Sequence, residues 1–259
     1  MLKKSLNSSV WGLFFLSLIL LTGCKTTSNS HLSHNLHENV VVNSLDGEDE
    51  KILDFVKPYK NHVDAEMSKT LSYAPETMDK SQGQWETSIG NLLTASAMEL
   101  VTPVFYQRTG EKIDICMFNH GGIRAMISKG EVSTRTAYEV MPFENEAVVL
   151  KLSANNIRDL AQYFIDKKRA HPLSNMQITI NKNNEIQQIT INGKPLDDKR
   201  DYHVLTSDFL ANGGDQMSFF TQAKERIDMD YKLRNVLIDY FTKHDTLPII
   251  KNHTVIVQP

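Results

Sequence analysis

Two alternating apolar segments, 176–180 and 186–191, flank the pair Asn183-Asn184 in this chain. This pattern is typical of a β-hairpin, in which two neighbouring strands run antiparallel. Other strand-like runs are mixed with helical patterns along the chain, and no internal repeat is visible. We therefore predict an α/β (α+β) fold whose sheet is mixed, with packed helices, and is not purely parallel.

Apolar residues at helical spacing predict the main helices. These helices cover about 48–69, a segment from about Thr87, a segment after Ser153, and about 231–243. Pro58 is an expected interruption of the first helix, and Pro103 is expected to kink or end the second. Ser153 is placed to cap the third helix. Apolar runs predict further strands at 112–118, 147–150, 202–206 and 254–257.

The N-terminus has the features of an export signal. Lys3 and Lys4 precede an apolar run, 10–21, that is too short to span a bilayer comfortably. The run leads into Leu21-Thr22-Gly23-Cys24, which resembles the lipobox of bacterial lipoproteins. From this resemblance we predict a lipoprotein signal peptide at 1–23 and lipidation of Cys24. The two or three acyl chains would then anchor the mature protein stably. The alternative is a plain secretory signal followed by an incidental cysteine.

Segment 24–47 is rich in Ser, Thr, Asn and His and lacks a periodic apolar pattern, so we expect a flexible tether there. The expected location is the bacterial cell envelope, with the lipid anchor on the periplasmic or cell-surface side of a membrane. Loss of Lys3 and Lys4 with the signal gives a mature charge of 26 − 31 = −5. Such a charge gives no reason to expect a nucleic-acid partner. Cys116, the remaining cysteine, is expected to be buried.

A short polar loop, Asn119-His120-Gly121-Gly122-Ile123-Arg124, follows the apolar run 112–118. Two adjacent glycines allow positive φ and a close approach to a ligand, because no Cβ is in the way. The guanidinium of Arg124 suits phosphate or carboxylate, and the amide of Asn119 offers both donors and an acceptor. Taken alone, however, two glycines after a strand are usually just a turn.

Two further loops change that interpretation: Met141-Pro142-Phe143-Glu144-Asn145, and the segment 208–215. Phe143 and Phe209 lie in turn-rich segments and not on a periodic apolar face. Each ring alone could pack beneath a loop, and Asp215 alone could stabilise a turn. Together with Arg124 they are the parts of a nucleotide site, in which stacking on aromatic rings contributes roughly 1–3 kcal/mol per base.

The three loops, in this order and spacing, resemble the signatures of the C-terminal domain of bacterial and animal 5′-nucleotidases. The similarity covers roughly 51–220 and implies the mixed α/β substrate-binding domain of that family, here over 48–259. It also implies that two rings clamp the nucleobase, an amide and a carboxylate contact base and ribose, and a guanidinium reaches the phosphate side. The substrate-binding residues so implied are Phe143, Phe209, Asn119, Asp215 and Arg124, with Gly121 and Gly122 in the first loop.

The sequence departs from the family pattern at two positions of the predicted site. His120 stands where the family commonly has Gly, although His is one of the residues that tolerate positive φ. The family usually carries a second anion-binding Arg shortly before the segment that matches Glu86. Lys80 is the cation that could replace it here.

The catalytic half of the family pattern is missing, because family members hold two metal ions in an N-terminal domain. Asp201-Tyr202-His203 and Asn61-His62 mimic ligand motifs, but Asp201 and His203 fall within a predicted strand and Asn61-His62 within a predicted helix. We therefore expect no catalytic residue, no metal site and no cofactor on this chain. Divalent metals would be supplied by a partner.

The leading hypothesis is the nucleotide-binding half of a split 5′-nucleotidase, active in nucleotide catabolism. A separate metallophosphoesterase chain would hold the metals and hydrolyse the phosphate ester. A second hypothesis is a non-catalytic surface lipoprotein that binds nucleotides or nucleosides. A third is a structural or interaction lipoprotein in which the site has decayed. Whether the chain forms part of a hydrolase thus depends on a partner.

Overall fold

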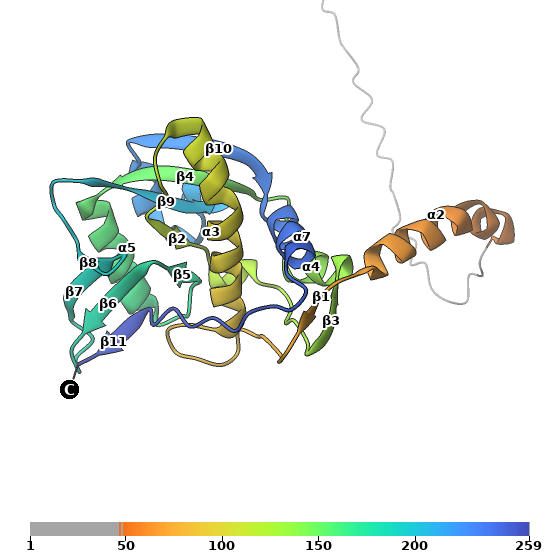
Figure 1. Ribbon diagram of the computed structural model, residues 1–259, viewed down its shortest axis with the longest axis horizontal. Coiled ribbons are helices and arrows are strands. Elements are labelled where there is room, and N and C mark those ends of the chain that lie inside the picture. Colours follow the sequence, from red (N-terminus) through yellow and green to blue (C-terminus); the bar gives the residue numbers. More distant parts are fainter. Residues whose placement is uncertain (1–46, 48, 259) are drawn as a thin grey trace, which may run out of the picture. The chain divides into compact units, whose positions relative to one another are not determined.

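A computed structural model describes residue 47 and residues 49–258, with the elements shown in Figure 1. The helices are α2 (Glu50–Ser68), α3 (Ser88–Thr109), α4 (Thr134–Val140), α5 (Ala154–Lys167), α6 (Asp208–Ala211) and α7 (Leu233–Lys243). Three short 3₁₀ turns are η1 (His120–Gly122), η2 (Gly214–Gln216) and η3 (Ser218–Gln222). The predicted signal peptide, Cys24 and nearly all of the predicted tether lie outside the described residues.

The largest sheet has five strands in the order β10-β4-β9-β2-β5. These strands are β10 (Glu225–Lys232), β4 (Glu146–Ser153), β9 (Asp201–Ser207), β2 (Ile115–Met117) and β5 (Leu173–Ser174). β2 and β9 run parallel, whereas the other neighbouring pairs run antiparallel. The predicted α/β fold with a mixed sheet is confirmed.

A second sheet has the order β11-β6-β7-β8 and contains the predicted hairpin. β6 (Met176–Ile180) pairs antiparallel with β7 (Ile186–Ile191), while β11 (Val255–Val257) joins β6 in parallel. The remaining strands are short: β8 (Lys194–Pro195) follows β7, and β1 (Thr70–Ala74) pairs with β3 (Gly130–Ser133). The hairpin loop is stabilised by Asn181, whose side-chain oxygen accepts hydrogen bonds from Asn183 and Glu185.

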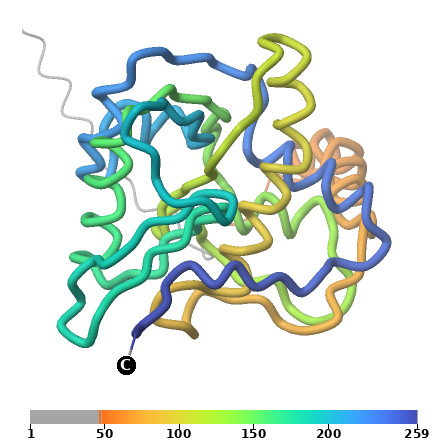
Figure 2. Tube along the Cα trace, turned by 60° about the vertical axis from the view of Figure 1, so that its left-hand side comes forward, coloured from red at the N-terminus to blue at the C-terminus, as the bar shows by residue number. Residues whose placement is uncertain are grey.

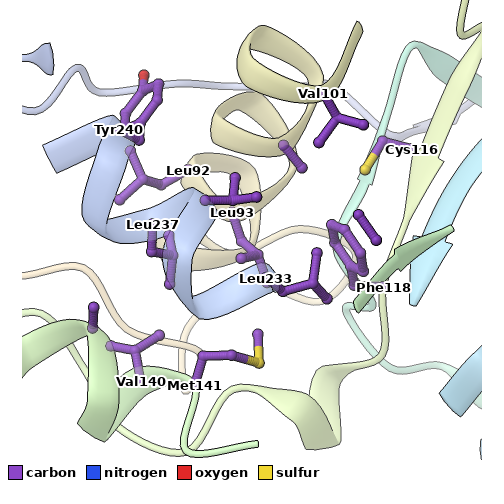
Figure 3. Close-up of a cluster of buried hydrophobic side chains, with 14 of the residues drawn as sticks. Leu92, Leu93, Val101, Cys116, Phe118, Val140, Met141, Leu233, Leu237 and Tyr240 are labelled. Atoms are coloured by element: carbon purple, nitrogen blue, oxygen red, sulfur yellow. The ribbon is translucent and has the colours of Figure 1, made fainter. Parts of the chain in front are cut away.

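Alternate residues of the central sheet pack into two different cores, because successive side chains of a strand point to opposite faces. Cys116, Val149 and Leu205 pack with α3, α4 and α7, whereas Val148 and Val204 pack with α5 and the second sheet. Figure 3 shows the first core, in which Leu92 and Leu93 of α3 lie close to Leu233 and Leu237 of α7. The central sheet is therefore covered on both faces and holds the loops at its strand ends rigidly.

Two prolines differ from the expectation that they break helices. α2 continues through Pro58, and α3 continues through Pro103 to Thr109. No residue of α2 is buried, and Pro103 of α3 is exposed, so each proline ring lies on the surface of its helix. No packed neighbour there opposes the small backbone shift that a proline inside a helix requires. Ser153 caps α5 as predicted, by accepting a hydrogen bond from the amide of Asn156.

The C-terminal stretch runs along the segment between β1 and α3, as Figure 2 shows in dark blue and orange-yellow. Glu86 fixes this arrangement, because its Oε2 accepts hydrogen bonds from the amides of Asn252 (2.8 Å) and His253 (3.1 Å) and from the side chain of Asn91 (2.9 Å). Among the described residues, no helix has the length and apolar character needed to cross a bilayer.

Candidate functional site

Three loops meet at one edge of the central sheet because of the directions of its strands. β2 and β9 are parallel, so the loops 119–124 and 208–215 leave from the same edge. β4 is antiparallel to β9, with Ala147 opposite Ser207, so the loop 141–145 reaches β4 at that edge too. The amide of Glu146 donates to Oδ1 of Asp208 at 3.2 Å and ties two of these loops together.

A cavity of about 340 Å³ lies between the three loops. It is lined by Asn119, Gly121, Gly122, Arg124, Phe143, Asn145, Phe209 and Asp215. Every substrate-binding residue implied by the sequence is thus brought to one place, and Asn145 is an addition. Phe143 and Phe209 are 37% and 44% exposed, so neither ring is buried in a hydrophobic core. That these residues contact a ligand remains a prediction.

The side chains of Asn119 and Asp215 form one unit on the cavity wall. Nδ2 of Asn119 donates to Oδ2 of Asp215 at 2.6 Å, while Oδ1 of Asp215 has no protein partner in the described part of the chain. Asp215 has a left-handed backbone (φ 53°), which is uncommon outside glycine. The hydroxyl of Tyr163 donates to the Asp215 carbonyl at 2.8 Å and supports that conformation. One carboxylate oxygen is therefore available to accept hydrogen bonds from a ligand.

The glycine pair of the first loop is used for close approach and not for positive φ. Neither Gly121 nor Gly122, nor His120, has a positive φ, and the three form the 3₁₀ turn η1. A Cβ at Gly122 would lie 2.8 Å from Oδ1 of Asn119, a distance that real Cβ atoms do not reach. The missing side chain at Gly122 thus leaves room for the Asn119 amide. His120 fits where the family commonly has Gly because its φ is not positive.

Gly214 provides the surface on which the Phe209 ring rests. A Cβ at this position would lie 2.4–2.6 Å from three carbons of the ring. The backbone of the loop 208–215 therefore fixes one of the two exposed aromatic rings, and any larger residue at 214 must displace it.

We expect Gly214→Ala to weaken binding of adenosine by up to about 1–3 kcal/mol, the contribution of one stacked ring. Isothermal titration calorimetry would measure the change. In a Phe209→Ala background the same substitution should have almost no further effect, because the ring that it displaces is already gone. An equal loss in both backgrounds would mean that Gly214 acts through something other than Phe209.

Positive charge collects on the side of the cavity where Arg124 lies. Arg124 is exposed, donates weakly to the Gly121 carbonyl (3.5 Å), and places its guanidinium carbon 5.7 Å from the centre of the Phe143 ring. Lys80 donates to the carbonyl oxygens of Ile123 (2.5 Å) and His120 (3.4 Å). Burial, and then the nearby charges of Arg124 and Arg169, lower the pKa of Lys80. These cations repel one another, so an anion bound among them would be stabilised.

His171 supports the first loop from beneath, a role that sequence reasoning missed. Its ring is buried, and its Nδ1 accepts a hydrogen bond from the amide of His120 at 3.2 Å. Nε2 is buried without a hydrogen-bond partner in the described part of the chain. Burial lowers the pKa of His171 to about 4. The carbonyl of the next residue, Pro172, accepts a hydrogen bond from the Phe118 amide at 2.9 Å, so the same segment also contacts the chain just before the first loop.

Other depressions in the described chain are larger but chemically less suited to a ligand. One of about 570 Å³ lies beside α5 and β7, and its Arg158 is already paired with Asp198. Another, of about 500 Å³, contains Asp201 and His203, which pair with Lys224 (2.7 Å) and Glu111 (2.9 Å). We therefore assign the candidate site to the smaller cavity between the three loops.

The described residues do not fit a two-metal centre. No group of three or more His, Cys, Asp and Glu side chains in residues 47 and 49–258 is placed to hold a metal ion. Asp201 and His203 lie in β9, and Asn61 and His62 lie in α2, as expected from the sequence. No reaction step through a metal can be derived from this part of the chain.

Comparison with known proteins identifies relatives of this arrangement. The profile of the family described as "5′-nucleotidase, C-terminal domain" matches residues 66–224. Protein UshA of Escherichia coli is 23% identical over 82% of this chain and 38% of its own length. The trifunctional nucleotide phosphoesterase protein YfkN of Bacillus subtilis is 26% identical over 67% of this chain and 13% of its own.

Solved structures show the same fold. A 5′-nucleotidase precursor from Thermus thermophilus superimposes with a TM-score of 0.65 at 22% identity, over 81% of this chain and 43% of that one. The NAD nucleotidase NadN of Haemophilus influenzae superimposes with a TM-score of 0.54 at 18% identity, over 82% of this chain and 42% of that one. The chain spans less than half the length of each of these relatives.

Proposed function

The chain belongs to the 5′-nucleotidase C-terminal domain family, and from this membership we propose that it is the nucleotide-binding half of a split 5′-nucleotidase. Membership supports a nucleotide-related function in general. The observation that carries the finer proposal is the single cavity of about 340 Å³, where all seven implied substrate-binding residues meet.

In this proposal each wall of the cavity binds one part of the ligand. The base stacks between the rings of Phe143 and Phe209, since every base offers a π-face to an aromatic side chain. Asn119 and Oδ1 of Asp215 hydrogen-bond the base edge and the ribose hydroxyls. Arg124, exposed and only weakly engaged within the chain, pairs with the phosphate. Two open rings and unused polar groups thus match the parts of a nucleoside monophosphate.

Hydrolysis in this proposal is carried out by a separate metallophosphoesterase chain. The proposal of a partner is supported by residues 47 and 49–258, in which no group of His, Cys, Asp and Glu side chains is placed to hold a metal ion. The partner would bring the divalent metals to the phosphate, while this chain binds and orients the base and ribose.

We place the pair at the bacterial cell envelope, with this chain held by a lipid on Cys24. Loss of palmitate labelling in a Cys24→Ala variant would test the anchor.

The test combines binding and activity. Calorimetry of the purified chain with AMP and adenosine measures binding, and mixing with metallophosphoesterases encoded beside its gene measures nucleotidase activity. We expect co-purification with one of them and a gain of AMP hydrolysis in the mixture. Absence of both complex and activity with every candidate would contradict the split enzyme.

The alternative function is a non-catalytic surface lipoprotein that binds nucleotides or nucleosides. It is favoured by the fact that the two exposed rings, the carboxylate of Asp215 and the guanidinium of Arg124, the groups suited to a nucleotide, all line one cavity of this chain. Binding of AMP or adenosine by the chain alone, with no activity in any mixture, would support this alternative. If no ligand binds with or without a partner, the third possibility, a structural lipoprotein with a decayed site, is the one that remains.

A further inference from the structure

The loop that carries Phe143 is held by the start of α7, a helix that contributes nothing to the cavity lining. The amide of Leu233 donates to the carbonyl of Asn145 at 2.9 Å. Nη1 of Arg234 donates to the carbonyl of Phe143 at 3.3 Å. The backbone on each side of Glu144 is thereby fixed from one helix.

Glu144 is held by the same helix start. Nη2 of Arg234 pairs with its Oε1, and Nζ of Lys232 pairs with its Oε2. These two cations lower the pKa of Glu144 to about 2, with Lys232 contributing most. Each of the three loop residues 143–145 therefore has a contact with 232–234.

Arg234 is itself fixed in one orientation. Its side chain is only 7% exposed, and its guanidinium carbon lies 4.1 Å from the centre of the Tyr138 ring of α4. Stacking on an aromatic face and a planar fork of donors are properties that Lys does not share. The guanidinium therefore links α4, α7 and the Phe143 loop in a single rigid geometry.

We infer that Arg234 is a positioning residue, which sets the affinity of the cavity by holding the Phe143 ring in place. The inference rests on the proposed nucleotide binding, because it concerns the ring that stacks on the base. It differs from a general role in folding, since a positioning residue must act through Phe143. Loss of Arg234 would leave the Phe143 carbonyl without its donor and let the loop move.

The test uses Arg234→Met, which keeps much of the side-chain length and removes the donors. Arg200→Met is the control, because Arg200 also lies over a tyrosine (Tyr202, 4.4 Å) and pairs with a carboxylate (Asp114, 2.7 Å), although its side chain is more exposed than that of Arg234, and none of these residues lines the cavity. We expect the Kd for adenosine to rise about tenfold in Arg234→Met and to stay unchanged in Arg200→Met.

Coupling to Phe143 separates positioning from a loss of stability. Arg234→Met should have almost no effect on the Kd in a Phe143→Ala background and its full effect in a Phe209→Ala background. An unchanged Kd in the single variant, or an equal effect in both backgrounds, would overturn the inference.

A measurement without ligand distinguishes this inference from the proposed function. With 4-fluorophenylalanine incorporated, the ¹⁹F resonance of Phe143 should shift or broaden in Arg234→Met and not in Arg200→Met. If the wild-type chain binds no nucleoside yet this resonance moves, the proposed function fails while the positioning of Phe143 stands. If adenosine binds and the resonance does not move, the inference about Arg234 is the one that fails.

Discussion

Replacing both Phe143 and Phe209 by alanine is expected to abolish measurable binding of adenosine and AMP. Each ring that stacks on a base contributes roughly 1–3 kcal/mol, so each single variant should raise the Kd by about 5- to 150-fold. Together the losses approach the whole affinity of a weak to moderate ligand. Calorimetry is the suitable measurement, because Trp85 packs on Phe164 (6.2 Å between ring centres) and does not line the cavity.

The folded state should survive these substitutions. Both rings are more than a third exposed, so each truncation should lower the unfolding free energy by about 1–2 kcal/mol, less than the roughly 3–5 kcal/mol lost when a fully buried Phe is replaced by Ala. Phe55→Ala is a matched control, since Phe55 is 71% exposed on α2 and should not alter binding. If the double variant binds adenosine as the wild type does, or if Phe55→Ala weakens binding equally, the stacking site is not where we propose.

The three loops could be found from the sequence because they interrupt periodic patterns at the ends of strands. Phe143 and Phe209 stood out as aromatics in turn-rich segments, and both prove to be exposed. Their convergence, however, depends on the strand order β4-β9-β2, which no local pattern encodes. Only the family resemblance, which summarises that topology, predicted that the loops meet.

Some elements were missed although a signal was present. In β10, Ile227, Met229 and Tyr231 alternate with charged residues, a period of two that indicates a strand with one exposed face. The apolar residues at helical spacing predicted the helix α2 correctly, yet no residue of α2 is buried. Periodicity reports which face is apolar, but it does not report whether another element covers that face.

Supporting contacts were out of reach of sequence reasoning. Arg234 contacts a loop some ninety positions away, and His171 contacts the amide of His120. Neither residue belongs to a recognisable motif, because each acts through a hydrogen bond to a backbone carbonyl or amide that is far away in the sequence. The residues that line the cavity could therefore be predicted, while those that hold the lining in place could not.

Acidification is expected to destabilise the chain through His171. Burial lowers the folded-state pKa of this group to about 4 from its ordinary value of 6.5. Between these values the unfolded chain binds a proton that the folded chain does not, so stability falls as the pH drops from about 6.5 to about 4. The largest loss is about 3 kcal/mol, reached below pH 4, and about 2 kcal/mol is lost by pH 5. Urea denaturation at pH 7.5, 6 and 5 measures this loss.

The variant His171→Asn isolates this contribution. The Asn side-chain oxygen can accept the hydrogen bond from the His120 amide that Nδ1 accepts now, and the side chain does not titrate. We expect its unfolding free energy to fall by about 2 kcal/mol less than that of the wild type between pH 7.5 and 5. His62→Asn, an exposed change on α2, should keep the pH dependence of the wild type. His171 lies beneath the loop that carries Asn119, so a parallel fall in adenosine affinity on acidification would connect this buried ring to the cavity. If the unfolding free energy depends on pH equally in the wild type and in His171→Asn, the low pKa of His171 is contradicted.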